Sequence, residues 1–196
     1  MIIGLVGPSL SGKNFFIEIV AELARNKRIG IVNTGELLKR TLNLWHLPGT
    51  RKNYQKLPEI MCGAYGEDVF SNVIGREVES KIATHDAVII NALRLPPDLP
   101  MLRSFYPNML IALTADDDVC VGRANQRREK VGEEHLTLEQ FLDEQNAYTE
   151  RFIKRISRYA DVPALANNGT REEFCEQIIG LYMNHIKPIL MRSIRF

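Results

Sequence analysis

Two patterns of hydrophobic positions alternate along the chain: short continuous apolar runs, and longer segments with apolar residues at helical spacing. Continuous runs are typical of strands buried on both faces of a parallel sheet. Apolar residues that recur at every third or fourth position lie on one side of a helix. The runs predict strands at residues 2–6, 29–32, 87–91 and 109–114, with a weaker fifth at 162–166. The spacing predicts helices at residues 13–25, 34–42, 52–62, 68–83, 116–128 and 137–159, a short one ending at 105, and a last one starting at Thr170.

This alternation of strand and helix with short connections predicts an α/β fold with helices on both faces of a doubly wound parallel sheet. The chain has 196 residues, which fits a single domain over residues 1–196. Thr34 is expected to cap the helix that it begins.

Composition narrows the function classes. Apolar residues make up 45% of the chain and charged residues 25%, which excludes a disordered or fibrous protein. The net charge of +1 gives no general case for binding nucleic acid or a membrane surface. No apolar run approaches the roughly 18–20 residues of a membrane span. Because the sequence opens directly with a predicted strand, we expect no signal peptide. Three scattered cysteines without a CxxC motif favour a reducing, cytoplasmic location with each cysteine in the core.

The strongest motif lies at the start of the chain, where Gly7-Pro8-Ser9-Leu10-Ser11-Gly12-Lys13-Asn14 joins a strand to an amphipathic helix. In this setting GxxxxGK is a phosphate-binding loop: glycines let the backbone N–H groups turn inward, and the helix N-terminus adds its positive dipole end. Lys13 is expected to reach the β- and γ-phosphates of ATP. The alternative is a tight strand-to-helix turn that happens to contain a lysine.

Asn14 departs from the motif, because the residue after the lysine is usually Ser or Thr, whose hydroxyl binds Mg²⁺. An amide oxygen can still serve as a neutral Mg²⁺ ligand. Asn14 is therefore a weak candidate for the metal, while the phosphate site is unaffected.

At this point the chain resembles a known family. The segment GPSLSGKNFF resembles the phosphate loop of the P-loop nucleoside monophosphate kinase group, in the branch that contains deoxynucleoside monophosphate kinases, phosphomevalonate kinase and dephospho-CoA kinase-like proteins. Further segments resemble that branch in order along the chain: TRKNYQKL, YGEDVFSNVI, VIINALRLPPDL, GRANQRRE, LTLEQF and NNGTREEF. The resemblance implies a three-layer P-loop sandwich with strand order 2-3-1-4-5, use of ATP and Mg²⁺, acceptor-binding helices at about 34–84 and a helical lid at about 123–140.

Arg94 is the main candidate for holding the acceptor. It follows the third strand, at the sheet edge where open α/β folds bind ligands, and arginine is suited to clamp an anion. Asn91 ends the same strand, where the resembling kinases usually carry an acid. Thr34, Lys39 and Arg51 lie in the segment that the resemblance assigns to the acceptor. Tyr54, Trp45 and Tyr65 could line its base, although aromatic residues there more often belong to the core.

A second basic group, Arg123, Arg127 and Arg128, lies on one predicted helix. The resemblance implies that these lid arginines reach the phosphoryl group in transfer, while a solvated helix face is the alternative. The run Arg151, Lys154, Arg155 and Arg158 is interpreted as a solvated face. The turn Asn167-Asn168-Gly169-Thr170 would run beside the adenine, through Asn168 and Gly169, and Thr170 would also cap the last helix.

These features predict an ATP-dependent kinase, with Lys13, Arg94, Arg123 and Arg127 as catalytic residues. The acceptor class expected first is a nucleoside or deoxynucleoside monophosphate, with dephospho-CoA as its rival. The alternative is a nucleotide-binding protein without turnover, which Asn14 and Asn91 favour. Small nucleotides are the expected partners, with no nucleic acid or membrane, and the chain is expected to be a monomer or a homodimer.

Overall fold

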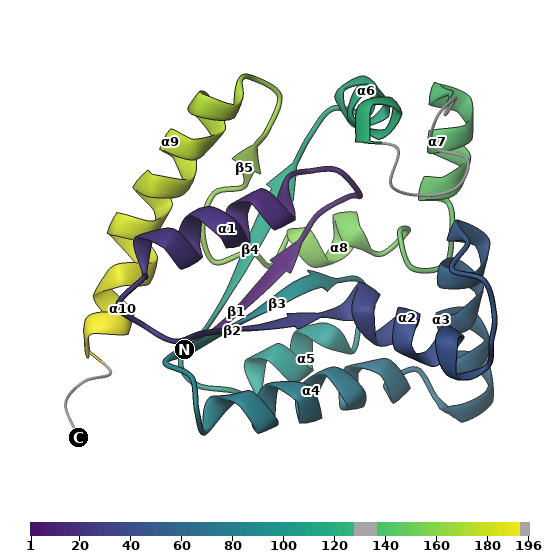
Figure 1. Cartoon of the computed structure of the whole chain (residues 1–196), viewed down its shortest axis with the longest axis horizontal. Coiled ribbons are helices and arrows are strands. Elements are labelled where there is room, and N and C mark those ends of the chain that lie inside the picture. The colour runs from purple at the N-terminus through teal and green to yellow at the C-terminus, as the bar shows by residue number, and fades with distance from the viewer. Residues whose placement is uncertain (128–136, 193–196) are drawn as a thin grey trace.

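The computed structural model describes residues 1–127 and 137–192. Five parallel strands form one sheet in the order β2-β3-β1-β4-β5 (Figure 1). This confirms the predicted fold and strand order, with the phosphate-loop strand at the centre. The strands are β1 (Ile2–Val6), β2 (Ile29–Asn33), β3 (Ala87–Leu93), β4 (Asn108–Thr114) and β5 (Leu165–Ala166).

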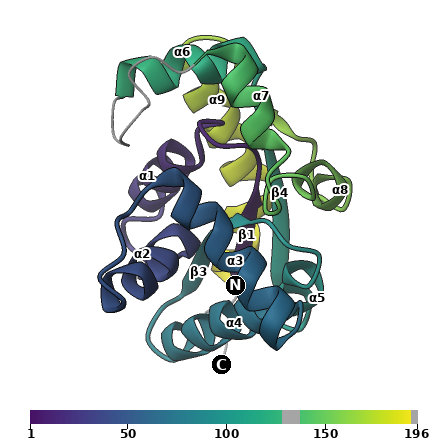
Figure 2. The same cartoon turned by 90° about the vertical axis from the view of Figure 1, so that its right-hand side faces the viewer.

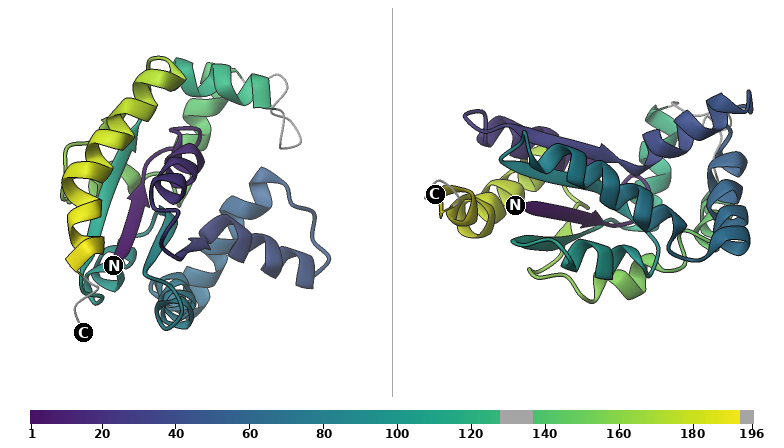
Figure 3. Two further views of the ribbon diagram at one scale, coloured as in Figure 1. Left: turned by 60° about the vertical axis from the view of Figure 1, so that its left-hand side comes forward. Right: turned by 90° about the horizontal axis from the view of Figure 1, so that it is seen from below.

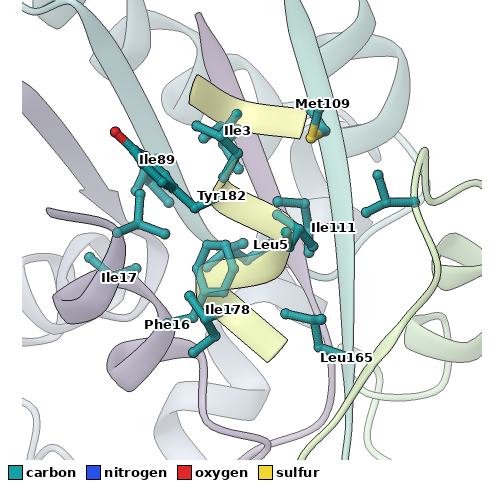
Figure 4. Packing of buried hydrophobic residues seen from close by; sticks show 14 of the residues in the cluster. Ile3, Leu5, Phe16, Ile17, Ile89, Met109, Ile111, Leu165, Ile178 and Tyr182 are labelled. Carbon is teal, nitrogen blue, oxygen red and sulfur yellow. The ribbon is translucent and has the colours of Figure 1, made fainter. Parts of the chain in front are cut away.

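Alternate residues of the central strands point to opposite faces of the sheet, as the period of two requires. On one face Ile3 and Leu5 of β1 pack with Phe16 of α1 and Ile178 of α9 (Figure 4). On the other face lies a second buried cluster, drawn from α2, α4, α5 and α8 as well as the strands. Helices on both faces of a parallel sheet explain why the strand sequences are apolar throughout.

The helices lie close to the predicted positions up to α6, and one later prediction is wrong. Their bounds are α1 (Lys13–Leu23), α2 (Thr34–Leu44), α3 (Arg51–Tyr65), α4 (Val69–Ile82), α5 (Asp98–Arg103), α6 (Asp117–Arg127), α7 (Leu138–Gln145), α8 (Ile153–Ser157), α9 (Arg171–Leu181), the π-helical turn η2 (Tyr182–Ile186) and α10 (Lys187–Arg192).

The single helix predicted at 137–159 is instead α7 and α8, separated by turns. Asn146 and Glu150 bond back by three residues, to the carbonyls of Asp143 and Ala147, so the backbone leaves the α-helical path. Asn, Tyr and Thr in this segment are weak helix formers. The apolar period continued across the break because Ile153 and Ile156 are buried against the sheet.

The start of α2 corrects another expectation. Asn33, not Thr34, caps this helix: its side chain accepts a hydrogen bond from the Gly35 N–H. The Thr34 hydroxyl instead donates to the carbonyls of Asn91 and Ala92. Thr34 therefore joins the start of α2 to the end of β3.

The end of β3 is irregular. Its pairing with β1 shifts register between Gly4 and Val6, and Ala92 has a φ of +74°. A bulge of this kind bends a strand and redirects its side chains. It lies at the carboxyl end of the sheet, immediately before Arg94.

The helices that follow the strands flank this carboxyl edge from two sides. α2 and α3 extend beyond it on one side and α6 and α7 on the other (Figures 1 and 2). α10 and the N-terminus lie toward the opposite end of the strands (Figure 3). Cys62 and Cys120 are buried as expected, whereas Cys175 is partly exposed. Within the described ranges, no helix is both long and apolar enough to cross a membrane.

Candidate active site

The loop between β1 and α1 wraps around the start of the helix. Leu10 and Gly12 have positive φ values of +67° and +96°, and such alternation turns successive N–H groups toward one side. Two close approaches require glycine here. A Cβ on Gly7 would lie 2.3 Å from the Leu113 carbonyl oxygen, and one on Gly12 would lie 2.4 Å from the Asn167 amide nitrogen. Helix α1 has no acidic residue in its first turn, so its N-terminus favours an anion.

Lys13 is 8% exposed, and its ammonium lies over the loop. The Nζ atom donates to the carbonyl oxygens of Gly7 at 2.9 Å and Pro8 at 2.6 Å, and lies 3.4 Å from Ser11 Oγ. The ammonium is held beside the loop by carbonyl groups that a phosphate would have to replace.

The loop opens into a cleft of about 1210 Å³. One half is lined by Ser9, Leu10, Gly12, Lys13 and Asn14 together with Arg123, Asn167 and Arg171. The other half extends over α2 and α3, with Thr34, Lys39, Tyr54 and Arg94. Gly7 and Ser11 support the loop from behind, Ser11 being fully buried. Asn91 also lines the cleft.

The two asparagines that depart from the family pattern contact each other. Asn91 Nδ2 donates to Asn14 Oδ1 at 2.8 Å. Asn91 is 6% exposed, and in the described part of the chain its Oδ1 is the one buried side-chain polar atom without a hydrogen-bond partner. Two neutral amide oxygens thus stand where the general phosphate-loop motif has a hydroxyl and where the resembling kinases usually carry an acid.

These oxygens are compatible with Mg²⁺, which accepts neutral oxygen ligands and retains several waters. The orphaned Asn91 oxygen would gain a partner from a cation or its water. Across residues 1–127 and 137–192, no cluster of three or more His, Cys, Asp or Glu could hold a metal. Most ligands of such an ion would therefore have to come from phosphate oxygens and water.

Asp98 fixes the turn that carries Arg94. One carboxylate oxygen accepts the backbone N–H groups of Arg94 at 2.7 Å and Leu95 at 2.8 Å. The other accepts the Ser71 hydroxyl at 2.7 Å. Burial raises the pKa of Asp98 above its usual value, opposed by these hydrogen bonds and by the Arg94 charge. Asp98 is thus a buried anchor that joins α4, α5 and the end of β3.

The Arg94 guanidinium is paired with Glu150, a residue of the turns between α7 and α8. Both side chains are largely withdrawn from water, with 22% and 11% of their surfaces exposed. The pair closes one wall of the cleft, where both residues are found. Sequence reasoning found Arg94 but gave no signal for Glu150.

Arg123 connects α6 to the phosphate-loop half of the cleft. Its guanidinium donates to the carbonyl of Leu10 at 3.2 Å and to the backbone and side-chain oxygens of Asn167, both at 2.9 Å. Asn167 in turn donates to the Ser11 carbonyl at 3.2 Å. This network ties the phosphate loop to the turn before α9.

The other predicted site residues have mixed positions. Asn168 accepts the Asp116 N–H at 2.8 Å, and neither it nor Gly169 lines the cleft; the neighbouring Asn167 does. Lys39 lies 3.8 Å from Glu36 and is half exposed. Arg51 begins α3 and Arg127 ends α6, but their side chains, and the whole of Arg128, lie outside the described residues.

Of the three aromatic candidates for the acceptor side, Tyr54 lines the cleft. Trp45 and Tyr65 are 71% and 72% exposed. They neither line the cleft nor belong to the core. In the phosphate-loop half of the cleft the Arg171 guanidinium lies over the Phe15 ring, 4.5 Å from its centre. The sequence motifs did not indicate that either residue of this pair would lie at the site.

Comparison with known proteins supports the fold. No protein-family model and no curated protein sequence matches the chain. Three solved shikimate kinases share its fold. The enzyme of Bacteroides thetaiotaomicron has a TM-score of 0.57 and 12% identity, covering 93% of this chain and 97% of its own. The enzyme of Acinetobacter baumannii, in complex with shikimate, has a TM-score of 0.51 and 15% identity, covering 93% of this chain and 92% of its own. The enzyme of Aquifex aeolicus has a TM-score of 0.53 and 14% identity, covering 95% of this chain and 98% of its own.

At these identities the likeness defines the architecture alone. The chain has the P-loop kinase fold, and the deoxynucleoside monophosphate kinase branch inferred from its motifs stays a prediction.

Proposed function

We propose that the chain transfers the terminal phosphoryl group of ATP to a small phosphorylated acceptor, first of all a nucleoside or deoxynucleoside monophosphate. The observation that carries the proposal is the cleft itself. A phosphate loop with a buried lysine opens at one end of it, and an arginine on a fixed turn lines the other. A site that only bound a nucleotide would not need the second half.

In this proposal Lys13 and the loop N–H groups hold the triphosphate, and Arg123 and Asn167 hold the lid helix against it. Arg94 orients the acceptor, with α2 and α3 forming its pocket. An acceptor oxygen attacks the γ-phosphorus as the bond from that phosphorus to the β,γ-bridging oxygen breaks, so ADP leaves with the electron pair. Catalysis of this kind depends on positioning and on neutralising charge.

Asn14 and Asn91 would hold Mg²⁺ or its waters. The ion, when bound with ATP, supplies charge neutralisation at the phosphate oxygens. The chain's own part is to present two oxygens without adding negative charge near the phosphates.

A nucleotide-binding protein without turnover is the second candidate. The neutral Asn14–Asn91 pair favours it, because both positions lack the usual metal-binding chemistry. The fixed Arg94 turn speaks against it.

The direct experiment measures ADP release with a panel of acceptors, with and without Mg²⁺. The panel contains the common nucleoside and deoxynucleoside monophosphates, dephospho-CoA, and shikimate, which one structural neighbour binds. We expect acceptor-dependent ADP release with a monophosphate and none with shikimate. Bound ATP without turnover on any acceptor would leave only the second candidate.

A further inference from the structure

The Arg94–Glu150 pair raises a question that the proposed function leaves open: what binds Arg94 when the acceptor is present. Arg94 lines the acceptor half of the cleft, yet its guanidinium already carries a carboxylate from the chain itself. A largely buried cation without a counter-charge is unfavourable. Glu150 therefore compensates Arg94 as the structure stands.

We propose that Glu150 occupies the place of the acceptor's anionic group on Arg94, and that it selects phosphate monoesters over carboxylates. The inference rests on the proposed function, because it names the group by which the acceptor is held. Glu150 is a specificity-determining residue in this account, and it takes no part in the chemical step.

The selection follows from charge and effective concentration. A phosphate monoester carries a charge of about −1.5 to −2 at neutral pH and can bind a guanidinium through two parallel hydrogen bonds. An acceptor carboxylate offers Arg94 only what Glu150 already provides. It must also compete with a group held nearby, whose effective concentration is on the order of millimolar or more. The dianion can displace Glu150, whereas the single carboxylate gains nothing by doing so.

The surroundings allow this exchange without moving Arg94. The backbone N–H groups of Arg94 and Leu95 are held by buried Asp98. Glu150 comes from a separate segment, the turns between α7 and α8. Phe152 and Ile153, which follow Glu150 in the chain, pack against the buried cluster on one face of the sheet. The segment is thus anchored to the core, and the Glu150 side chain can leave Arg94 while both backbones stay in place.

The other described charges of the acceptor half do not provide an equal site. Lys39 lies within 4 Å of Glu36, and both side chains are more than half exposed. Such a pair is screened by water and contributes little. Arg94 is thus the most enclosed cation in the described lining of this half.

The test uses two probes that differ only in their anionic group, phenyl phosphate and benzoate, titrated against the full chain. The readout is the NMR signal of the Arg94 Nε–H group, assigned with Arg94→Lys, so that phosphate binding at the Lys13 loop is not mistaken for binding at Arg94. Glu150→Gln removes the competing charge. Glu77→Gln is the matched control, since Glu77 pairs with Arg40 at 2.7 Å outside the cleft.

We expect phenyl phosphate to shift the Arg94 signal of the wild type, and benzoate to leave it unchanged over the same range. In Glu150→Gln both probes should shift the Arg94 signal, and phenyl phosphate should do so at a concentration about tenfold lower than in the wild type. Glu77→Gln should behave as the wild type. Equal responses of the wild-type signal to both probes would overturn the inference, as would unchanged titrations in folded Glu150→Gln.

The comparison of the two probes on the wild type does not depend on any variant, so it tests the inference even if Glu150→Gln fails to fold. Glu150→Asp, which keeps the charge on a shorter side chain, should lie between wild type and Glu150→Gln. Binding as expected, with no phosphoryl transfer in the acceptor panel, would support this inference and reject the kinase. Phosphoryl transfer with an Arg94 signal insensitive to phenyl phosphate would do the opposite.

Discussion

At the scale of single residues, the glycines of the phosphate loop carry the strictest requirement. Gly12 has a φ of +96°, and a Cβ placed on it would lie 2.4 Å from an atom of Asn167 and 2.8 Å from one of Phe174. A Cβ on Gly180, within α9, would have nothing within 4 Å. One substitution, glycine to alanine, therefore has opposite consequences at the two sites.

We predict that Gly12→Ala lowers the free energy of unfolding by about 2–4 kcal/mol and weakens ATP binding, because both strain and overlap must be relieved at the loop. Gly180→Ala should raise it by about 1 kcal/mol through helix propensity. Urea denaturation and ATP titration of both variants check this. A Gly12→Ala protein as stable as the wild type would show that the loop adopts another conformation.

Asp98 gives a prediction on pH. Its pKa is raised in the folded chain, mainly by burial, so between its unfolded and folded pKa values the folded state binds more protons. Stability from this group must therefore fall as the pH rises from about 4. The free energy of unfolding of the wild type, minus that of Asp98→Asn, should decrease over that range.

Asp86 is the control of opposite sign. Its pKa is lowered, chiefly by the hydrogen bond from the Arg28 N–H, so its contribution is present above about pH 4 and is lost in acid. The free energy of unfolding of the wild type, minus that of Asp86→Asn, should therefore increase with pH. Denaturation from pH 3 to pH 7 measures both, and parallel pH profiles for the two variants would reject the assignment.

The asparagine pair shows what sequence could and could not provide at this scale. The departures at Asn14 and Asn91 were visible from the motifs, but their contact was not, because 77 residues separate them. That contact matters for mutation: an aspartate at 91 could only accept a hydrogen bond from Asn14, and it would place a charge at a position that is 6% exposed.

We therefore predict that Asn91→Asp alone destabilises the chain by about 1–2 kcal/mol, because it buries a charge, whereas Asn14→Ser with Asn91→Asp offers the ion a hydroxyl and a charged ligand together. The double variant should bind Mg²⁺ in the nucleotide complex about tenfold more tightly. Titration of Mg²⁺ against nucleotide affinity measures this. An unchanged Mg²⁺ requirement would place the ion away from both residues.

At the scale of elements, most helices and strands follow from periodicity, and the exceptions have physical causes. β5 is shorter than its apolar run, since only Leu165 and Ala166 pair with β4. The break between α7 and α8 escaped detection because the buried positions kept helical spacing across it. The capping box at Thr170 and Glu173, in contrast, is local chemistry and was predictable.

The attachment of α6 depends on Arg123, whose hydrogen bonds reach both the phosphate loop and the turn before α9. Lysine cannot span these acceptors, because it lacks the planar fork of arginine. We predict that Arg123→Lys weakens ATP binding about tenfold and costs about 1–2 kcal/mol of stability.

Calorimetric ATP titration and thermal unfolding check this, with Arg155→Lys on the exposed face of α8 as the control. ATP affinity equal to that of the wild type in Arg123→Lys would show that α6 is not held to the nucleotide site through this residue.

At the scale of the whole molecule, the sheet order was predictable because the resemblance to P-loop kinases places the first strand at the centre, and right-handed crossovers constrain the rest. The phosphate half of the cleft followed from the phosphate-loop motif. The other half did not, because it is assembled from α2, α3, the Asp98 turn and Glu150, which are far apart in sequence and carry no shared motif. In the proposed function, the class of acceptor therefore depends on tertiary contacts that no spacing shows.

The central claim is that the phosphoryl group moves from ATP to an acceptor. The most direct measurement uses ATP radiolabelled at its γ-phosphate and follows the label with nucleoside monophosphates and Mg²⁺, for the wild type and for Lys13→Ala. We predict label in the acceptor product and not only in inorganic phosphate, with a rate reduced at least about a hundredfold in folded Lys13→Ala. Label found solely in inorganic phosphate, or equal transfer by both proteins, would contradict the account.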